Sequence, residues 1–379
     1  MKKLVALLML VVLVGCSTSK DKPIEEKKNE VVAKEDIDVS FMAVGDNLIH
    51  NSLYFDAKIE NGYDFNPMFV PIKPYVEKAD IAYINQETIL GGTELELSNY
   101  PCFNSPQEAG DALVATGFDW INQATNHSLD RGEAGIVSAM NFWDKYPDIV
   151  TTGINRNKEE EQKFRYIKRK DINFGLLSYT YGTNGIEEPE GKAYLVNNID
   201  KDQMKKDVEA IKKTCDVIIV SMHWGNEYQT TPSDEQKDIA QYLSDLGVKV
   251  IIGSHPHVIQ PVNYVTSKSG NKTLVIYSLG NFISAQNDTI NMLGGMSTFT
   301  IHKDGKTNEY SVVDPEFYPT VTHFEANQTN FKTYVLKDYS DELASKHYLN
   351  GLNGTGSITK EILTNKCKEI MGDEIRVVY

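Results

Sequence analysis

Short apolar runs alternate with amphipathic segments from residue 38 onward. Buried strands are expected at 39–44, 81–84, 118–123, 149–152, 217–222, 248–252 and 274–278, where apolar runs end at glycine or polar residues. Helices are expected at 68–78 (broken by prolines), 107–116, 133–146, 201–213 and 233–246, with a hairpin over 166–178 about Lys170-Asp171. Alternating strands and helices predict an α/β fold.

The pattern changes after about residue 300. Strands at 297–301 and 310–313 flank a turn at Asp304-Gly305, and a polar, helix-prone segment follows them. We therefore expect one main domain over 38–300 and a small C-terminal appendage over 301–379, without visible chemistry of its own.

The N-terminus has the layout of a secretory signal. Two lysines precede an uncharged apolar run at 4–14, which is about half the roughly 20 residues of a spanning helix. The run ends at Leu13-Val-Gly-Cys16, which resembles the lipobox of bacterial lipoproteins. This resemblance implies a signal peptide at 1–15, cleavage before Cys16 and lipid on that cysteine. An ordinary signal peptide with a chance cysteine is the alternative.

The following segment, 16–37, is rich in Lys, Glu and Asp, and we interpret it as a charged tether rather than a folded part. Together with Cys16 it predicts an exported protein, held by lipid at the extracytoplasmic face of the cell membrane.

Charge and cysteine content exclude some classes of partner and of metal site. The formal net charge is −15, and loss of Lys2 and Lys3 with the signal makes it more negative still. Such a surface argues against nucleic acid as a partner and against adhesion to anionic lipid by charge. Besides Cys16, only Cys102, Cys215 and Cys367 remain, which allow at most one disulfide and show no zinc-binding spacing.

The chemistry-bearing residues follow the expected strands. In open α/β sheets, ligands bind at the edge formed by the carboxyl ends of the strands. Six polar residues stand just past a strand end and would meet at that edge: Asp46, Glu87, Asn126, His223, His255 and Asn281.

Five of the eight histidines lie in this set or beside it. His255 and His257 bracket Pro256, and side chains at i and i+2 of an extended segment share one side. Carboxylate, amide and imidazole ligands suit Mn, Fe or Zn, and two such ions can clamp a phosphoryl group. A lone histidine is more often a hydrogen-bonding residue, and Asn126 or Asp46 alone could be a cap. We expect His302, His323 and His347 at the surface.

The order of these residues resembles the motif series of calcineurin-like metallophosphoesterases. That resemblance implies a layered sandwich of β-sheets flanked by helices and a pair of divalent ions. It makes His127 the catalytic residue that protonates the leaving oxygen. Two departures stand out: His50 is separated from Asp46 by three residues instead of one, and Glu87 replaces the usual Asp. The implied metal ligands are Asp46, Glu87, Asn126, His223, His255 and His257.

A narrower resemblance covers about residues 38–285. The segments Phe41–Asp46, Asn85–Thr88, Ala124–Asp130, His223–Tyr228, Gly253–His257 and Ser278–Phe282 are similar to CapA-type proteins of poly-γ-glutamate capsule synthesis. The resemblance adds Asp130, Glu227 and Asn281 as further pocket candidates, beside His50 from the wider pattern. It implies poly-γ-glutamate synthase subunits and the polymer as partners. Whether the chain is an enzyme stays open: a metal-dependent surface phosphoesterase, or a ligand-binding lipoprotein without catalysis, are the alternatives.

Overall fold

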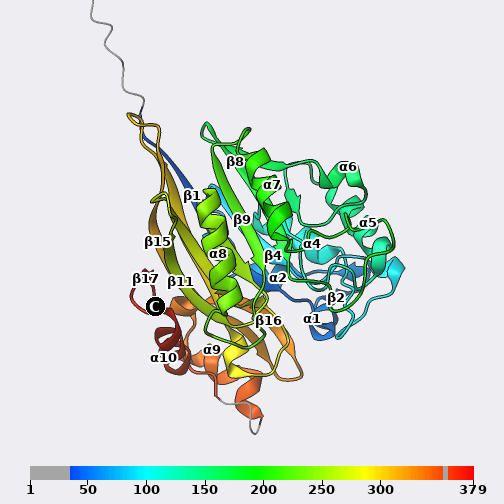
Figure 1. Ribbon diagram of the computed structural model, residues 1–379. Coiled ribbons are helices and arrows are strands. Elements are labelled where there is room, and N and C mark those ends of the chain that lie inside the picture. Colours follow the sequence, from blue (N-terminus) through cyan, green and yellow to red (C-terminus); the bar gives the residue numbers. More distant parts are fainter. Residues whose placement is uncertain (1–34, 353–356) are drawn as a thin grey trace, which may run out of the picture. The chain divides into compact units, whose positions relative to one another are not determined.

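Two large β-sheets make up most of the computed structural model, which describes residues 35–352 and 357–379 (Figure 1). The expected signal peptide, the lipidated Cys16 and the tether as far as residue 34 lie outside the described residues. Within the described ranges, no helix combines the length and the apolar character that crossing a membrane requires.

The larger sheet has a parallel half and an antiparallel half. β1, β4, β5 and β6 run parallel, whereas β14, β15 and β16 are antiparallel to their neighbours. β13 pairs with β1, and β17 pairs with β15. In spatial order the strands are β16 (Thr329–Val335), β15 (Tyr310–Glu325), β14 (Leu293–Lys303), β1 (Ile37–Asn47), β4 (Ile81–Gln86), β5 (Trp120–Asn122) and β6 (Val150–Thr152), with β13 (Asn281–Ile283) and β17 (Arg376–Val377) beside them.

The second sheet has six strands, of which the inner four are parallel and the two edge strands antiparallel. Lys170 and Asp171 both have positive φ in the hairpin between β7 and β8, at the predicted turn. The spatial order is β11 (Ile259–Thr266), β12 (Lys272–Leu279), β10 (Val250–Ser254), β9 (Val217–His223), β8 (Ile172–Thr180) and β7 (Arg165–Arg169). A separate small hairpin joins β2 (Lys58–Ile59) and β3 (Gly62–Tyr63).

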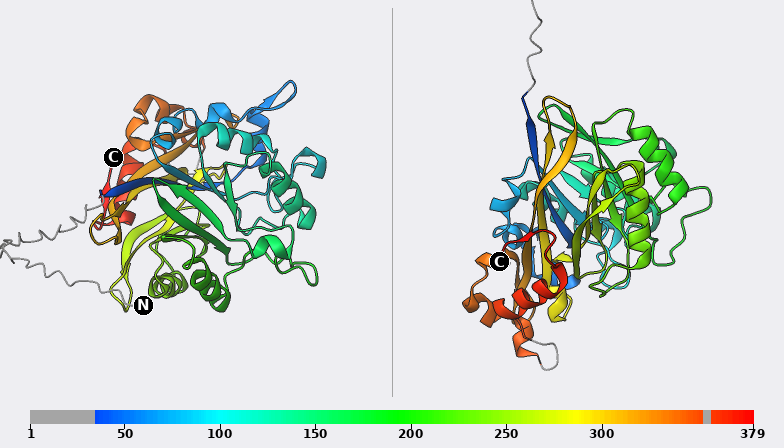
Figure 2. Two further views of the ribbon diagram at one scale, coloured as in Figure 1. Left: turned by 90° about the horizontal axis from the view of Figure 1, so that it is seen from above. Right: turned by 60° about the vertical axis from the view of Figure 1, so that its left-hand side comes forward.

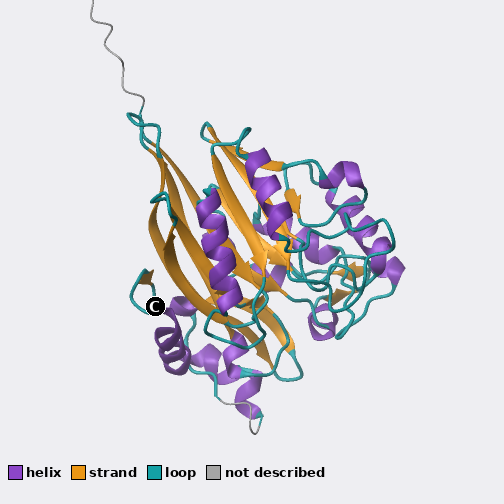
Figure 3. Cartoon of the chain, in the orientation of Figure 1, coloured by secondary structure: helices purple, strands orange, loops and turns teal. Residues whose placement is uncertain are grey.

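Helices flank the sheets, as Figures 1 and 3 show. Pro67 and Pro74 stand in the first turns of α2 and α3, which replace the single broken helix expected there. The helices are α1 (Asn51–Asp56), α2 (Asn66–Phe69), α3 (Lys73–Val76), α4 (Glu108–Thr116), α5 (Gly132–Trp143), α6 (Lys158–Glu161), α7 (Lys201–Ile211), α8 (Asp234–Leu246), α9 (Asp341–Lys346) and α10 (Lys360–Met371). Four short 3-10 helices span 93–95, 289–292, 336–338 and 348–351.

The sheets face each other across a shared apolar core. Phe41 of β1 stacks on Phe299 of β14 and meets Phe174 of the other sheet edge-on, with ring centroids 4.9 Å apart in the second pair. On the outer face of the six-stranded sheet lie α7 and α8 (Figure 2). They bury Met204 and Ile239 in a second core. These layers confirm the predicted α/β fold of sheets flanked by helices.

The C-terminal part differs from the expected appendage. β14 runs through residue 300 and pairs with β1 along eight residues, while β15 and β16 extend the same sheet. The strands of the expected appendage, β14 to β17, therefore share a sheet with the main domain. His323 and His347, expected at the surface, are buried in this part. Cys102, Cys215 and Cys367 are free thiols.

Candidate metal centre

The candidate site lies where the carboxyl ends of the parallel strands of the two sheets meet. Asp46 stands opposite Asn85 of β4 and Asn281 of β13 in the register of β1. Asn85 Nδ2 donates to Asp46 Oδ1 at 2.8 Å, and the Asp46 amide donates to the Gly280 carbonyl at 2.9 Å. A Cβ on Gly45 would lie 1.8 Å from that carbonyl oxygen, so only glycine permits this backbone contact. The position of Asp46 is thus set by the backbone.

One group of potential ligands comprises Asp46, Glu87 and His257, all of which are buried. His257 Nδ1 lies 3.4 Å from Asp46 Oδ2, and His257 Nε2 lies 3.5 Å from Glu87 Oε1. Asn281 Oδ1 is 3.1 Å from His257 Nδ1. Each of the three ligand residues offers an atom within 4.8 Å of the others, which is close enough to surround one ion.

A second group comprises Glu87, His223 and His255, again within 4.8 Å of one another. Asn126 joins it, because its Oδ1 lies 2.8 Å from His223 Nε2. A third combination adds the exposed Glu227 to His255 and His257. Glu87 is common to the first two groups, so its longer side chain reaches both sides of the cluster.

The unsatisfied atoms of this cluster fit a cation. Both carboxylate oxygens of Glu87, and Nδ1 of His255, are buried and lack a hydrogen-bond partner in the described part of the chain. Burial holds the pKa of Glu87 well above its usual range, although His257 opposes the shift. Leaving such groups unpaired costs several kcal/mol in a protein interior, on the order of a lost charge-assisted bond each. A bound divalent ion would satisfy them.

Burial also controls the imidazoles. It lowers the pKa of His255 to about 3, assisted by His257, and holds the pKa of His223 well below its usual range. Both rings are therefore neutral near pH 7, which is the form that binds metal. Burial acts in the same direction on His257, but Glu87 and Asp46 outweigh it and raise the pKa of His257 to about 9.

His127 is held at the rim of the cluster by two contacts. Its Nδ1 lies 2.7 Å from Asp130 Oδ2, and its ring meets Phe103 edge-on at 4.7 Å. The Phe103 amide also donates to Asp130 Oδ2, at 2.6 Å. Nε2 of His127 has no hydrogen-bond partner among the described residues. A histidine with one nitrogen fixed by a carboxylate and the other free is suited to proton transfer.

His50 lies beside the cluster, outside the closely spaced ligand groups. It stands at the start of α1, where its Nδ1 is 3.2 Å from the Leu48 carbonyl and 3.3 Å from the Ala285 amide. Burial lowers the pKa of His50 to about 4. Three intervening residues carry the chain from the end of β1 into α1, which places this imidazole apart from Asp46.

Tyr181 also belongs to the site, and sequence reasoning missed it. It follows β8 directly, and its ring centroid is 4.5 Å from that of His255. The rule that placed the other residues at strand ends would have found it, had the hairpin strand been counted among the site-forming strands.

Tyr228 lines the mouth of the site. It is 54% exposed, with its ring centroid 6.2 Å from that of His257. Its φ of +64° is strained for an aromatic residue, and its amide donates to the Pro256 carbonyl at 2.8 Å. His255 and His257 also have positive φ, so three ring-bearing residues of the site have a strained backbone.

In this α/β protein two β-sheets pack together, and the ends of their strands bring buried carboxylates and imidazoles to one place. This arrangement defines a class of protein with a candidate multinuclear metal centre. The sequence profile of the family described as "Bacterial capsule synthesis protein PGA_cap" matches residues 40–286. This segment holds every candidate ligand, and the chain belongs to that family.

Two curated relatives carry related names. The chain is 28% identical over 207 residues to the "PGA biosynthesis protein CapA" of Bacillus subtilis (strain 168), covering 52% of this chain and 51% of the relative. It is 25% identical over 295 residues to the "Capsule biosynthesis protein CapA" of Bacillus anthracis, covering 74% of this chain and 67% of the relative. The match thus spans about half the length of the first relative.

Solved structures give more distant likenesses. A phosphatase from Mycoplasma pneumoniae aligns at 13% identity with a TM-score of 0.45, covering 76% of this chain and 95% of that one. The calcineurin-like phosphoesterase YfkN from Bacillus subtilis aligns at 13% identity with a TM-score of 0.44, covering 88% of this chain and 97% of that one.

Proposed function

We propose that this protein is a membrane-anchored accessory protein of poly-γ-glutamate capsule synthesis or export, with a pair of divalent ions in its strand-end cluster. Membership of the capsule synthesis family carries the proposal, and the names of the two Bacillus relatives support it. The unpaired Glu87 carboxylate, common to two ligand groups, supports the metal pair. Mn, Fe and Zn all suit the donor set of carboxylates, imidazoles and an amide.

The anchor and the partners form the second part of the proposal. Lipid on Cys16 would hold the chain at the extracytoplasmic face of the membrane, and the acidic surface favours such an anchor over adhesion by charge. In that position the protein would act beside the poly-γ-glutamate synthase subunits and the emerging polymer.

Within the site, each ligand residue has a distinct task. Asp46 and His257 would hold one ion, and Asn126, His223 and His255 the other, with Glu87 shared between them. Bound ions of this kind supply Lewis acidity to a phosphoryl or carbonyl oxygen. Asn85 and Asn281 keep Asp46 and His257 in place through hydrogen bonds.

Elemental analysis tests the metal pair. Purified wild-type protein is expected to contain two equivalents of metal, and a variant with both His255→Ala and His257→Ala is expected to lose both. His347→Gln, which changes a buried histidine outside the closely spaced ligand groups, is the matched control and should keep them. A wild-type protein that holds no metal after loading with Mn, Fe or Zn would contradict the proposal.

Gene replacement in a capsulated host tests the cellular role. Deletion is expected to abolish surface polymer, and Cys16→Ser is expected to release a folded protein that no longer supports it. Cys102→Ser, an exposed thiol, is the control and should support normal polymer. An unchanged capsule in the deletion strain would refute the role in capsule synthesis.

A second candidate function, a metal-dependent phosphoesterase or related hydrolase, is favoured by the geometry of His127. Its Nδ1 is paired with Asp130 while Nε2 is free to donate a proton to a leaving oxygen. Metal-loaded protein should then hydrolyse an aryl phosphate, with His127→Ala reducing kcat about 100-fold or more. Bound metal without turnover would count against this second function and would be compatible with the accessory role or with a ligand-binding lipoprotein.

A further inference from the structure

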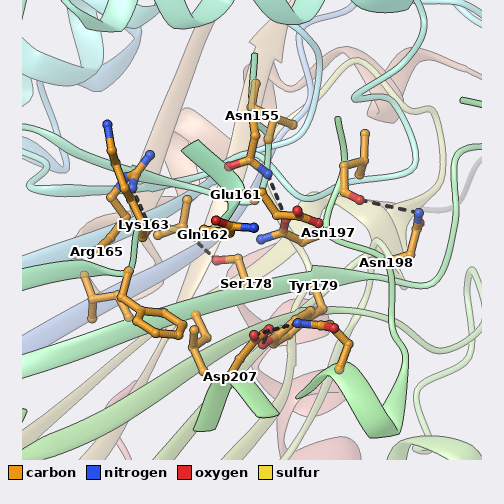
Figure 4. Close-up of a pocket in the computed structure, with 18 of the residues that line it drawn as sticks. Asn155, Glu161, Gln162, Lys163, Arg165, Ser178, Tyr179, Asn197, Asn198 and Asp207 are labelled. Carbon is orange, nitrogen blue, oxygen red and sulfur yellow. Dashed lines mark hydrogen bonds between the residues drawn. The ribbon is translucent and has the colours of Figure 1, made fainter. Parts of the chain in front are cut away.

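A cavity of about 520 Å³ lies between the two sheets, away from the metal centre. Its walls come from β6, β8, α6, α7 and the segment 193–200, and none of the candidate metal ligands lines it. Its volume is within the range of small-molecule sites in proteins. Figure 4 shows the side chains that line it.

The cavity has fixed walls. The amide of Asn155 donates to the Leu195 carbonyl at 3.0 Å, and the Asn197 amide donates to the Gly153 carbonyl at 2.9 Å. Between the sheets, Thr152 Oγ1 and Ser178 Oγ are 2.6 Å apart. These bonds tie the segment 193–200 to the chain that leaves β6, so the space is built by ordered backbone on several sides.

One side of the cavity presents a cation without an ion-pair partner. Arg165 is half-buried, and its Nη1 donates to the Lys163 carbonyl at 2.5 Å. Among the residues that the structure describes, no carboxylate lies within ion-pair distance of its guanidinium. Burial lowers the pKa of Arg165, although the charge of Glu160 opposes the shift. A guanidinium in this position is a ready partner for a carboxylate.

Another side presents a carboxylate without an ion-pair partner. Asp207 accepts hydrogen bonds from Tyr179 Oη and Gln203 Nε2, both at 2.8 Å. No Lys, Arg or His of the described ranges lies within ion-pair distance of it, and burial raises its pKa. In Figure 4, Lys163 and Arg165 lie apart from Tyr179 and Asp207, with Ser178 between them.

Amide groups complete the lining. Asn155 Nδ2 donates to Asn197 Oδ1 at 2.9 Å and to the Tyr194 carbonyl at 2.8 Å. This leaves Asn155 Oδ1 and Asn197 Nδ2 without partners in the described structure, one as an acceptor and one as a donor. Such a pair matches a ligand that carries both kinds of polar group.

The charges of the cavity are balanced, unlike those of the acidic metal centre. Its charged lining residues are three cations and three anions: Lys158, Lys163, Arg165, Glu161, Asp200 and Asp207. A polyanion would gain from one half of this set and be repelled by the other, whereas a zwitterion can satisfy both.

We propose that this cavity binds a small zwitterion of the amino-acid class, as a free amino acid or a dipeptide. Its carboxylate pairs with Arg165, its ammonium group faces Asp207, and its remaining polar atoms bond to Asn155 and Asn197. The site is independent of the proposed metal centre and of the role in capsule synthesis.

Ligand-detected NMR on the purified chain tests the proposal. The probes are one pool of the twenty common amino acids and one pool of dipeptides, and at least one member is expected to show saturation transfer. The best binder is then titrated calorimetrically against three variants. Arg165→Gln and Asp207→Asn should each weaken binding about tenfold or more, as expected for loss of a charge-assisted bond. Lys168→Gln, on the same strand as Arg165 but exposed and outside the cavity, should bind as wild type does.

Two further arms locate the binding. An N-acetylated form of the ligand should bind wild type and Asp207→Asn equally, since it has no ammonium group to lose. The variant with His255→Ala and His257→Ala, and protein treated with a chelator, should bind as strongly as wild type. No signal from either pool, equal binding by Arg165→Gln, or loss of binding with the metal-centre variant would each overturn the proposal.

Discussion

Two clusters of buried histidines in this protein differ in what surrounds them. In the strand-end cluster, His223, His255 and His257 share their space with the buried carboxylates of Asp46 and Glu87. In the C-terminal cluster, His347 Nε2 is 3.0 Å from the Thr322 carbonyl, and His323 Nδ1 is 2.7 Å from Tyr339 Oη. Among the residues that the structure describes, Glu325 is the only carboxylate that pairs with this cluster, and about a third of its side chain is exposed.

The contrast shows that burial alone does not distinguish a ligand from a structural histidine. Both clusters bury their imidazoles and lower most of their pKa values. Among the described residues, only the strand-end cluster places a fully buried carboxylate, that of Glu87, against them with two oxygens that lack hydrogen bonds. His257 Nε2 lies 3.5 Å from one of these oxygens, and a bound cation would satisfy both, so this carboxylate marks the cluster suited to metal.

The largest effect is expected from Glu87→Gln. Loss of the carboxylate shared by both ligand groups should weaken Mn²⁺ binding by about 100-fold or more. The metal-free protein should lose little stability, because Gln keeps the size of the side chain and replaces a buried carboxyl group whose oxygens lack hydrogen bonds in the described residues. Calorimetric titration and thermal unfolding measure the two quantities. Glu325→Gln is the matched control in the other cluster. If Glu87→Gln bound Mn²⁺ within tenfold of the wild-type affinity, the buried carboxylate would not distinguish the two histidine clusters.

His323→Ala should have the opposite profile. Truncating this buried ring leaves a cavity and an unpaired Tyr339 hydroxyl, so the free energy of unfolding should fall by about 2–4 kcal/mol. Metal content should not change. His302→Ala, near the end of the inner strand β14, removes only a largely exposed pairing with Asp38 and should alter stability by no more than about 1 kcal/mol. Metal loss in His323→Ala would mean that the two clusters are coupled.

A pH titration of stability separates the clusters further. Burial lowers the pKa of His347 to about 4, below the value of about 6.5 in the unfolded chain. Its contribution is therefore complete above pH 6.5 and is lost as the pH falls towards 4, since only the unfolded state takes up the proton. His347→Gln should flatten this slope by up to about 1.4 kcal/mol per pH unit, measured by denaturant unfolding. An unchanged slope would show that folding does not lower the pKa of His347.

The smallest effect is expected from Tyr228→Gly at the mouth of the metal centre. Glycine relieves the strain of φ +64° but gains freedom in the unfolded chain, so stability should change by no more than about 1 kcal/mol. Tyr181→Ala is the comparison variant. It removes the ring that contacts His255, at a position without positive φ. A large loss of stability in Tyr228→Gly would show that the exposed ring is structural.

Local pattern predicted much of the site, because parallel strands deliver their C-terminal residues to one edge. Asp46, Glu87, Asn126, His223 and His255 each followed from an apolar run and the polar residue after it. What the pattern could not supply was pairing between distant segments. The register of β14 against β1 joins residues more than 250 positions apart, and no local signal records it.

The same limit explains the histidines expected at the surface. His323 lies in β15, and its burial depends on Tyr339 and His347, which fold back over it from later in the chain. The position of His50 likewise depends on Ala285, a residue remote in sequence. The cavity at Arg165 and Asp207 is assembled from four separated segments, and sequence reasoning did not find it.

The contact between Gly45 and Gly280 has a consequence for how this protein can diversify. It joins the chain leaving the six-stranded sheet to the central strand of the other, at the point where Asp46 and Asn281 emerge. Because backbone atoms alone make this junction, changes in the surrounding loops need not disturb it. The rim of the site can therefore acquire new shapes and partners over evolutionary time, while the spacing of the ligands beneath stays constant.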